Sequence, residues 1–436
     1  MEWQIQLLIL LAGLLGLMAT GMTVVFSFLT VNAFAMFCWW GGAAGLEMLI
    51  LSIQKSITHF RLLPIPLFIL LGTLMFETGM GENMIDALDK WLGRLPGRLG
   101  LLAVFAGALF GSLSGSSMSS VAMLGSLLTP EMEKRGYKKP MSLGPILGSG
   151  GLSVMIPPSN LGVLLGAIGG ISIGSILIAI IIPGLLMTLF YASYIILVCV
   201  LKPQLAPRYE IVSYSLREKL LYAVKDLLPL GVIIFLVTGV IFFGIASPTE
   251  AAATGTMGCI VLALLKGKFS WKIFIKSLYR TVNISVMVLF IICTSEAYSQ
   301  NLAYSGITRE LAQFVINLEV PSMIVIIGMV VVLIGLGMIM AVPPIMMITL
   351  PIFLPVVSAL GYNEVWFAVV FLLCMEMSQT SPPFGLTLFV MKGVSPSGTT
   401  LEDCWKAAIP FLGCDLVVLI LLLVFPIIAI WLPGLM

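Results

Sequence analysis

Six long stretches of this chain contain no charged side chain. Asp, Glu, Lys and Arg are all absent from residues 3–46, 99–130, 140–201, 227–249, 320–363 and 416–436. A helix that crosses a lipid bilayer needs about 20 mostly apolar residues, so these stretches have room for several such helices. Only 10% of all residues are charged, against about 25% in an average soluble domain. The sequence therefore predicts an all-α polytopic membrane protein.

The same composition excludes several kinds of chemistry. His59 is the only histidine, so the chain lacks the residues for a histidine-based metal site or a Ser–His–Asp triad. It has no Walker A sequence, so we expect no bound nucleotide and no ATP hydrolysis. Its Lys and Arg residues lie in short segments between apolar runs, and we expect no nucleic acid as a partner. The chain is expected to act within the bilayer and not to be an enzyme.

Two of the uncharged stretches are interrupted near their middle. Residues 111–120 read GSLSGSSMSS, and residues 335–344 contain two glycines and a proline pair. The apolar pieces on either side are about fifteen residues long, which is too short to cross a bilayer. Non-helical backbone at membrane depth is tolerated where protein or a water-filled cavity surrounds it. We therefore expect two re-entrant hairpins, at about 99–135 and 320–360.

The chain contains an internal repeat in which landmarks of the two halves share one offset in residue number. Three pairs have this offset in common: Pro130 with Pro355, Gly136-Tyr137 with Gly361-Tyr362, and Pro157-Pro158 with Pro382-Pro383. Upstream of them, Gly79 pairs with Gly306 at nearly the same offset. Chance coincidence of prolines and glycines is the alternative, and a shared offset at three places makes it the weaker one. Structural repeats are common in secondary transporters.

The charges that flank the two hairpins differ. Six basic residues flank the first hairpin: Arg94, Arg98, Lys134, Arg135, Lys138 and Lys139. The positive-inside rule places the open end of this hairpin in the cytoplasm. The second hairpin has mixed and acidic flanks and is expected to open outward, which makes the repeat inverted. Four segments mix apolar and charged side chains as interfacial helices do, namely residues 43–60, 82–95, 209–222 and 268–280.

The interruption in the first hairpin is rich in hydroxyl groups. Residues 114–120 read SGSSMSS. Small residues let two backbones approach each other, and hydroxyls with freed carbonyls supply oxygen ligands for a small cation. A close helix contact that binds nothing is the other explanation of such a segment. Its recurrence within a repeat favours ion binding.

A pair of prolines follows each hairpin, at residues 157–158 and 382–383. Proline has no N–H group and clashes with the preceding turn, so a helix must open there. Two broken helices with freed carbonyls are therefore expected. Glu376 lies five residues before Ser381 in an otherwise uncharged segment, and an ionisable residue at membrane depth is a functional candidate. A protonated or hydrogen-bonded carboxyl that faces the helix bundle is the alternative.

Taken together, these segments resemble the large membrane subunit of the tripartite ATP-independent periplasmic (TRAP) transporters. The similar segments extend over nearly the whole chain and are residues 65–72, 114–120 with Pro130, 135–137, 156–159, 337–338 and 381–390. The chain departs from the family pattern at both tips, where Ser120 and Ala341 replace acidic residues, and at Glu376, which stands at a usually neutral position. The resemblance implies an inverted-repeat elevator transporter, with a mobile transport domain that contains both hairpins and both broken helices.

The elevator architecture that the resemblance implies divides the chain into five parts. In chain order these are scaffold helices and an arm (1–60), the first repeat of the transport domain (61–170), scaffold helices and a cytoplasmic arm (171–280), the second repeat (281–392) and a C-terminal scaffold helix (393–436).

The resemblance also implies a function and partners. We expect Na⁺-driven uptake of a small organic anion, a carboxylate or a sulfonate, across the bacterial inner membrane. A soluble periplasmic binding protein would deliver the substrate, and a small four-helix membrane subunit would be a separate chain. A stand-alone ion-coupled carrier that needs no binding protein is the alternative. An intramembrane enzyme is a third possibility, for which the chain offers only Glu376 as a deep acid.

Site residues follow from the two tips and the two proline breaks. One Na⁺ is expected in each half. The first would be held by Ser114, Gly115, Ser116, Ser117 and the backbone at Met155 and Pro157. The second would be held by Gly337, Met340, Val342, Ser378, Thr380 and Ser381. The substrate is expected between the tips, at Ser116, Ser159, Asn160 and Thr380, and Glu376 is the candidate coupling carboxylate. We expect no arginine at the substrate, so that backbone amides and hydroxyls would hold the anion.

Overall fold

The computed structural model describes residues 2–93, 95–207 and 215–436, and all regular structure in these residues is helical. Six helical stretches are long and apolar enough to cross a membrane, or seven if a bent pair of helices counts as one. They are Ile173–Leu201, Leu216–Phe242, Pro248–Leu265, Trp271–Tyr304, Val342–Ala359 and Leu401–Val424, with Lys139–Met155 and Asn160–Gly169 as the bent pair. The expected all-α multi-pass membrane protein is confirmed.

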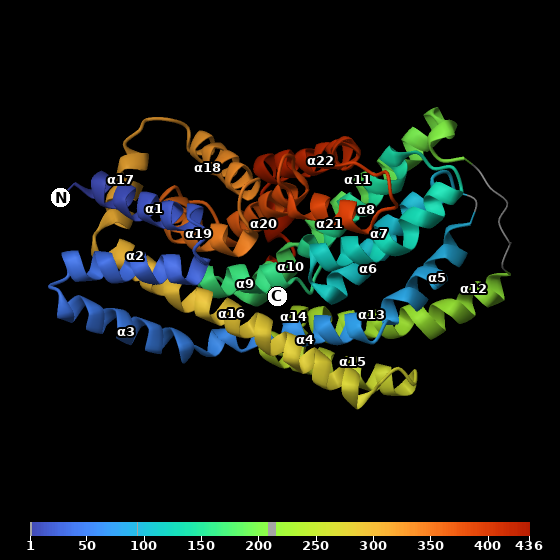
Figure 1. Cartoon of the computed structure of the whole chain (residues 1–436), viewed down its shortest axis with the longest axis horizontal. Helices are drawn as coiled ribbons and strands as arrows, with labels where there is room; N and C mark the ends of the chain where they lie inside the picture. The colour runs from blue at the N-terminus through green and yellow to red at the C-terminus, as the bar shows by residue number, and fades with distance from the viewer. Residues whose placement is uncertain (1, 94, 208–214) are drawn as a thin grey trace.

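One group of helices forms a layer along one side of the molecule (Figure 1). It consists of α1 (Trp3–Ala19), α2 (Val24–Trp39), α3 (Ala43–Ile57), α4 (Pro64–Glu77), α12 (Leu216–Tyr222), α13 (Leu228–Ile234), α14 (Val240–Phe242), α15 (Pro248–Leu265) and α16 (Trp271–Tyr304). The longest of them, α16, packs against α2, α3 and α4, and α15 packs against α4. We call this layer the frame.

A second group packs around α8 and contains both hairpins. It consists of α6 (Arg98–Ser114), α7 (Ser117–Lys134), α8 (Lys139–Met155), α9 (Asn160–Gly169), α10 (Ile173–Ala179), α11 (Ile181–Leu201), α18 (Ser322–Gly337), α19 (Val342–Ala359), α20 (Glu364–Thr380), α21 (Leu386–Val394) and α22 (Leu401–Val424). The helices α6, α7, α11, α20 and α22 all contact α8. We call this group the block.

Small residues bring the helices of the block close together. A Cβ atom on Gly111 of α6 would lie 2.9 Å from the Ser153 Cβ of α8, and one on Gly148 would lie 2.6 Å from the Phe411 ring of α22. Side chains larger than hydrogen would therefore push α8 away from its neighbours. Short connecting helices complete the chain, namely α5 (Met80–Leu92), α17 (Ile307–Ile316) and α23 (Ile427–Ile430).

The elements of the two halves follow one another in the same order. Each hairpin is followed by a helix of 17 residues, α8 in the first half and α20 in the second. The two helices begin and end at corresponding positions of the repeat, because their bounds are related by the same offset as the proline pairs. Gly79 and Gly306, which we paired from the sequence, both precede a helix in left-handed conformation, with φ of 60° and 75°. The expected breaks thus lie where the landmarks placed them.

The frame differs from expectation at α16. Residues 268–280 were expected to form a separate interfacial piece before the second repeat begins at residue 281, but α16 runs unbroken for 34 residues from Trp271 to Tyr304. The stretch contains neither glycine nor proline, so nothing in its backbone ends the helix at the charged residues. The expected boundary at 280/281 therefore falls inside one helix. The other three amphipathic segments, 43–60, 82–95 and 209–222, contain α3, most of α5 and α12, and their residues 94 and 209–214 lie outside the described residues.

Three helices contact helices of other expected parts of the chain. Both α11 and α22, expected in the scaffold, pack against α8, and α4, expected in the first repeat, packs against α15 and α16. The contact with α22 is close, since Gly144 and Gly148 of α8 lie against Phe411. The hairpin arms are also longer than expected: α7 and α19 each have 18 residues, because each tip is shorter than the interruption in the sequence.

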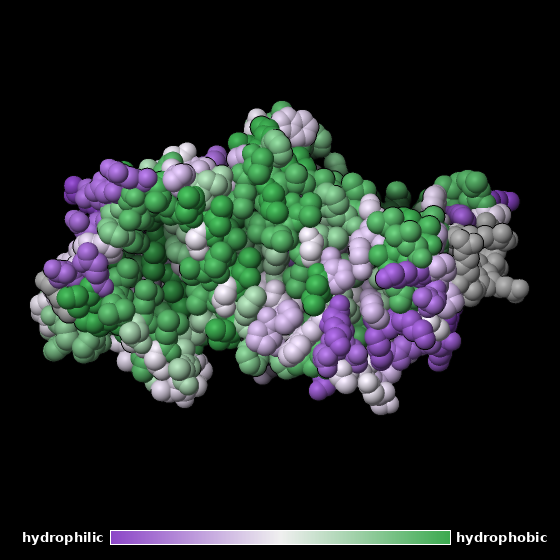
Figure 2. Space-filling view, turned by 90° about the horizontal axis from the view of Figure 1, so that it is seen from above, coloured by the Kyte–Doolittle hydropathy of each residue, from purple (hydrophilic) through white to green (hydrophobic). Residues whose placement is uncertain are grey.

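The outer surface of the molecule is largely apolar. Figure 2 shows hydrophobic side chains over most of one face, with hydrophilic ones gathered toward the two ends. Large apolar side chains such as Phe26, Leu189 and Phe290 are exposed. Soluble monomers rarely expose large contiguous apolar patches, and lipid covers such a surface in a membrane protein.

Candidate functional site

The tip of the first hairpin is a two-residue connection between α6 and α7. Gly115 has a φ of 61°, in the left-handed region that side chains disfavour. Ser116 is extended and caps α7, because its hydroxyl accepts a hydrogen bond from the Ser119 N–H at 3.3 Å. The C-terminal end of one helix and the N-terminal end of the next therefore meet at Gly115 and Ser116.

This tip lies against the first broken helix. The Asn160 side-chain amide donates to the Ser114 carbonyl at 3.5 Å, and a Cβ on Gly115 would lie 2.5 Å from the same amide nitrogen. The Ser117 and Ser153 hydroxyls lie 3.0 Å apart. The structure thus brings together four predicted residues of the first tip (Ser114, Gly115, Ser116 and Ser117) with Asn160, the first residue of the helix after the proline break.

A cavity of about 340 Å³ opens beside the first tip, between the block and the frame. The block contributes hydroxyl and amide groups, and the frame contributes α4 and α16. Its lining residues include Ser114, Ser116, Ser119 and Asn160 from the block, with Thr73, Phe76 and Arg280 from the frame. The lining is mainly apolar with a few polar groups, which is typical of cavities that bind small molecules.

The second tip and the second break also pack closely. Gly337, the last residue of α18, lies directly against the side chain of Ser378, so a Cβ there would overlap with it. This contact corresponds to that of Gly111 with Ser153 in the first half, because Ser153 and Ser378 occupy the same position of the repeat. Met340 lies half-buried in the turn, and Val342 is the buried first residue of α19.

Oxygen atoms at the two breaks differ in their hydrogen bonds. In the second break the Ser378 carbonyl accepts from the Ser381 N–H at 3.3 Å, and the Gln379 carbonyl accepts from the Thr387 hydroxyl at 2.7 Å. In the first break Pro157 and Pro158 have no N–H, so the carbonyls four residues earlier lose the donors of a continuous helix. The Met155 carbonyl lies against Gly184 of α11.

Two predicted substrate residues do not line the cavity. The Ser159 hydroxyl is buried and accepts from the Gly162 N–H at 3.2 Å, which caps α9. The Thr380 hydroxyl donates to the Met377 carbonyl at 3.1 Å, and the Ser381 hydroxyl donates to the same carbonyl at 2.7 Å. Among the expected substrate residues, the cavity brings together Ser116 and Asn160.

Glu376 lies deep in the block, with 1% of its surface exposed. Its carboxyl group occupies the space that a side chain on Gly151 of α8 would fill. No N–H or hydroxyl donor reaches either carboxyl oxygen, and the Asp415 carboxyl of α22 lies close enough to form a hydrogen bond with Glu376 when one of the two carries a proton. Asp415 is equally buried and accepts a hydrogen bond from the Tyr191 hydroxyl of α11. Glu376 was a candidate from the sequence, but Asp415 and Tyr191 were not, because no local motif connects these two residues to Glu376.

Arg280 also lines the cavity beside the first tip. We expected no arginine at the substrate because the transport region of the sequence lacks an arginine at membrane depth, and residues 268–280 were expected to be interfacial. The unbroken α16 instead carries Arg280 into the lining of the cavity at the first tip. The absence of glycine and proline between residues 271 and 304 is the signal that could have revealed this continuity.

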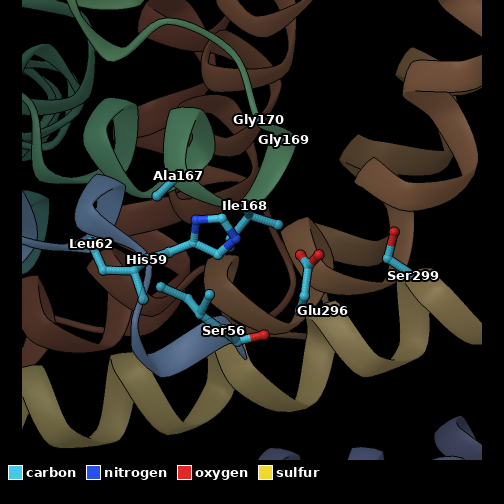
Figure 3. A pocket seen from close by; sticks show the side chains of 10 residues that line it. Ser56, His59, Leu62, Ala167, Ile168, Gly169, Gly170, Glu296 and Ser299 are labelled. Carbon is cyan, nitrogen blue, oxygen red and sulfur yellow. The ribbon is translucent and has the colours of Figure 1, made fainter. Parts of the chain in front are cut away.

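Another cavity, of about 270 Å³ and with a mainly polar lining, lies near the other end of α16. Figure 3 shows His59 and Glu296 among its lining side chains, with Ser56, Ser299 and the end of α9 around them. It contains none of the predicted site residues. It therefore contributes no support to the expected ion and substrate sites.

Comparison with known proteins identifies one family. Residues 11–428 match the family model described as "Tripartite ATP-independent periplasmic transporter, DctM component". The C4-dicarboxylate TRAP transporter large permease protein DctM of Pseudomonas aeruginosa is 32% identical over 390 residues, covering 88% of this chain and 89% of the relative. The isethionate TRAP transporter permease protein DctMQ of Oleidesulfovibrio alaskensis is 28% identical over 380 residues, covering 87% of this chain and 59% of the relative.

The fold is similar to that of a solved transporter with little sequence identity. The YdaH transporter of Alcanivorax borkumensis superimposes with a TM-score of 0.68 and 16% identity, covering 88% of this chain and 90% of that chain. Both sequence relatives are named as transporter permeases and neither is named as an enzyme.

Proposed function

The chain belongs to the DctM component of the tripartite ATP-independent periplasmic transporters, the large membrane subunit of a binding-protein-dependent secondary transporter for organic acids, and from this premise we propose its coupling ion, substrate class and movement. It takes up a small organic anion across the bacterial inner membrane, driven by Na⁺, by an elevator movement of the block against the frame. The observation that carries the proposal is the cavity of about 340 Å³, which lies between the tip of a hairpin and two frame helices.

The substrate class is supported by the chemistry of the cavity and by the relatives. Hydroxyl and amide groups of Ser116, Ser119 and Asn160 line one side of it, and such neutral donors hydrogen-bond a carboxylate or sulfonate. Two relatives are named for a C4-dicarboxylate and for isethionate, a sulfonate. We propose a carboxylate or sulfonate of similar size as the substrate of this chain.

The residues at the first tip suit Na⁺. The groups that they offer are hydroxyl and carbonyl oxygens, and the proline pair leaves two carbonyls of α8 without helical donors. Ser114, Gly115, Ser116 and Ser117 with the backbone of Met155 and Pro157 would hold one ion, and Gly337, Met340, Val342, Ser378, Thr380 and Ser381 would hold a second. Bound Na⁺ supplies positive charge that offsets the charge of the anion during its passage. The chain's own residues orient the anion and close the tip over it.

Glu376 supports a second candidate for the coupling ion. Its carboxyl is buried and both of its oxygens lack a hydrogen-bond donor, which favours a neutral, protonated group. A proton carried at Glu376 would accompany or replace Na⁺.

Three partners follow from the family. Large permeases of this family work with a small membrane subunit and a periplasmic binding protein. We propose that the small subunit of this transporter is a separate four-helix chain. The lipid bilayer contacts the remaining apolar surface.

Uptake into proteoliposomes tests the proposal. The purified large and small subunits are reconstituted together, and the binding protein is added outside with a labelled C4-dicarboxylate or isethionate. We expect uptake to depend on an inward Na⁺ gradient and on the binding protein, and to be unaffected by ATP. Uptake without the binding protein would favour the stand-alone carrier, and uptake driven by a proton gradient in Na⁺-free medium would move the coupling role to Glu376.

A matched pair of variants tests the ion site. Ser116→Val adds branched carbon at the tip, whereas Ser126→Val makes the same change at an exposed position on the same hairpin, in α7. Both variants should insert normally. Only Ser116→Val should lose most of the Na⁺-driven uptake, and equal uptake in both would contradict the assignment of the first tip.

A further inference from the structure

We propose that Arg280 binds the negatively charged group of the substrate in the cavity at the first hairpin tip, and that it leaves Glu77 to do so. This inference rests on the proposed function and adds to it a recognition residue contributed by the frame. Arg280 lies on α16 of the frame, whereas the hydroxyl groups of the tip belong to the block, and both line the cavity.

Arg280 supplies the only charge among the described residues that line this cavity. The other polar groups there, on Thr73, Ser114, Ser116, Ser119 and Asn160, are neutral. A guanidinium carries five N–H donors in a planar fork that fits a carboxylate or a sulfonate with two parallel hydrogen bonds. An anion between the tip and α16 would therefore meet hydroxyls on one side and a cation on the other.

The charges around Arg280 leave one positive charge without a negative partner. Glu77 on α4 contacts two cations: its Oε1 lies 3.2 Å from the Arg280 Nη1, and its Oε2 lies 2.6 Å from the Lys276 Nζ. Two positive side chains thus share a single carboxylate. One bound anion would balance the group.

The geometry also shows which cation can leave Glu77. Only 8% of the Glu77 side chain is exposed, so this carboxylate needs a partner to remain ionised. Lys276 provides the shorter contact and can continue to satisfy it when Arg280 turns away. Arg280 donates to Glu77 through one nitrogen at 3.2 Å, which leaves its other N–H groups free for the substrate.

Phe76 holds the guanidinium at the edge of the cavity. The Arg280 Cζ lies 5.4 Å from the centre of the Phe76 ring, within the range of a cation–π contact. Phe76 itself lines the cavity. A small movement of the Arg280 side chain across this ring would exchange Glu77 for a substrate anion without removing the guanidinium from its aromatic contact.

The test measures the KM of uptake and direct substrate binding in four variants of the full transporter. Arg280→Gln removes the charge and the fork, and we expect its KM for a C4-dicarboxylate to rise at least about 10-fold, the loss typical of a charge-assisted pair. Arg280→Lys keeps the charge without the fork and should recover part of this loss. Lys272→Gln removes a positive charge two turns earlier on α16, outside the cavity, and serves as the matched control with an unchanged KM.

Lys276→Gln provides a readout that a purely structural role would not give. Without Lys276, Glu77 has Arg280 as its remaining contact among the pairs described above, so Arg280 should stay on Glu77 and the KM should rise although Lys276 does not line the cavity. An Arg280→Gln transporter with wild-type KM, or the same loss in Lys272→Gln, would overturn the inference.

Binding of the labelled C4-dicarboxylate to the detergent-purified complex separates this inference from the proposed function. Loss of binding in Arg280→Gln supports the role of Arg280 even if wild-type uptake proves independent of Na⁺ or of the binding protein. Conversely, Na⁺-driven uptake with normal binding in Arg280→Gln would keep the proposed function and reject Arg280.

Discussion

Gly115 shows how a single residue fixes the position of the first tip. Two independent features exclude a side chain there: a φ of 61°, and the Asn160 amide, 2.5 Å from where a Cβ would be. The left-handed conformation alone costs a non-glycine residue about 1–2 kcal/mol. A side chain at residue 115 would also push away Asn160, the residue that connects the tip to the broken helix.

We therefore expect Gly115→Ala to lower the thermal stability of the purified protein and to abolish most uptake. Gly335→Ala in the other hairpin is the matched control, because a Cβ at Gly335 would meet no atom within 4 Å and the residue lies inside α18. A melting temperature and an uptake rate are measured for both. Equal behaviour of the two variants would show that the tip tolerates a side chain.

Sequence reasoning worked well where a residue acts through its own backbone and poorly where it acts through a distant partner. The proline pairs at 157–158 and 382–383 each remove two consecutive N–H donors, and α8 and α20 end just before them, so both breaks could be predicted. The hydroxyls of Ser159 and Thr380 were predicted to face substrate, but each is used locally, in a cap and in a bond to Met377. Local satisfaction of hydroxyls is common in helices, and composition does not reveal it.

At the scale of elements, the two helices that follow the hairpins give the sharpest test of the inverted repeat. Lys138 and Glu364 are exposed residues at the starts of α8 and α20. If the second half is inverted relative to the first, these helix starts lie on opposite sides of the membrane. The basic residues near Lys138 place it in the cytoplasm.

Single cysteines at these two positions should react with impermeant thiol reagents from opposite sides. Lys138→Cys should be labelled only from the cytoplasm, and Glu364→Cys only from outside. Cys38 is an exposed native cysteine and is replaced first. Labelling of both positions from the same side would rule out the inverted arrangement.

Element lengths and partners were only partly predictable. Uncharged stretches located the spans Ile173–Leu201 and Val342–Ala359, because apolar length is what the bilayer requires, but Pro248–Leu265 and Trp271–Tyr304 lie almost entirely outside such stretches. They did not reveal that α16 continues through Lys276 and Arg280, since charged side chains do not stop a helix that lacks glycine and proline. Nor did they reveal that α22 packs on α8, because contacts such as Gly148 with Phe411 join residues that are far apart in the chain.

At the scale of the whole molecule, the cavity at the first tip joins the two groups of helices. Gly72 of the frame lies against the Ser114 carbonyl of the block, which a Cβ there would approach to 2.6 Å. Thr73 and Met118, one from each group, line the same cavity. If the block moves against the frame during transport, a covalent link across this cavity must stop it.

We expect a thiol cross-linker between Thr73→Cys and Met118→Cys to block uptake, and reduction to restore it. The comparison pair is Thr73→Cys with Thr281→Cys, whose native hydroxyls lie 2.9 Å apart and which join two frame helices. The Thr73→Cys/Thr281→Cys variant should take up substrate at nearly the same rate after cross-linking as after reduction. Undiminished uptake with the first pair linked would argue against relative movement of frame and block.

The unbroken α16 also fixes the distance between two residues that line different cavities. Arg280 and Glu296, which line the cavities of about 340 Å³ and 270 Å³, lie on this one continuous helix. Their separation along its axis is about 24 Å, at a rise of about 1.5 Å per residue. This is most of the thickness of the hydrocarbon core, about 30 Å. Residues on one continuous helix keep a constant separation. Distances from a probe on α9 to Arg280 and to Glu296 would therefore report the displacement of the block relative to α16, without reference to the lipid.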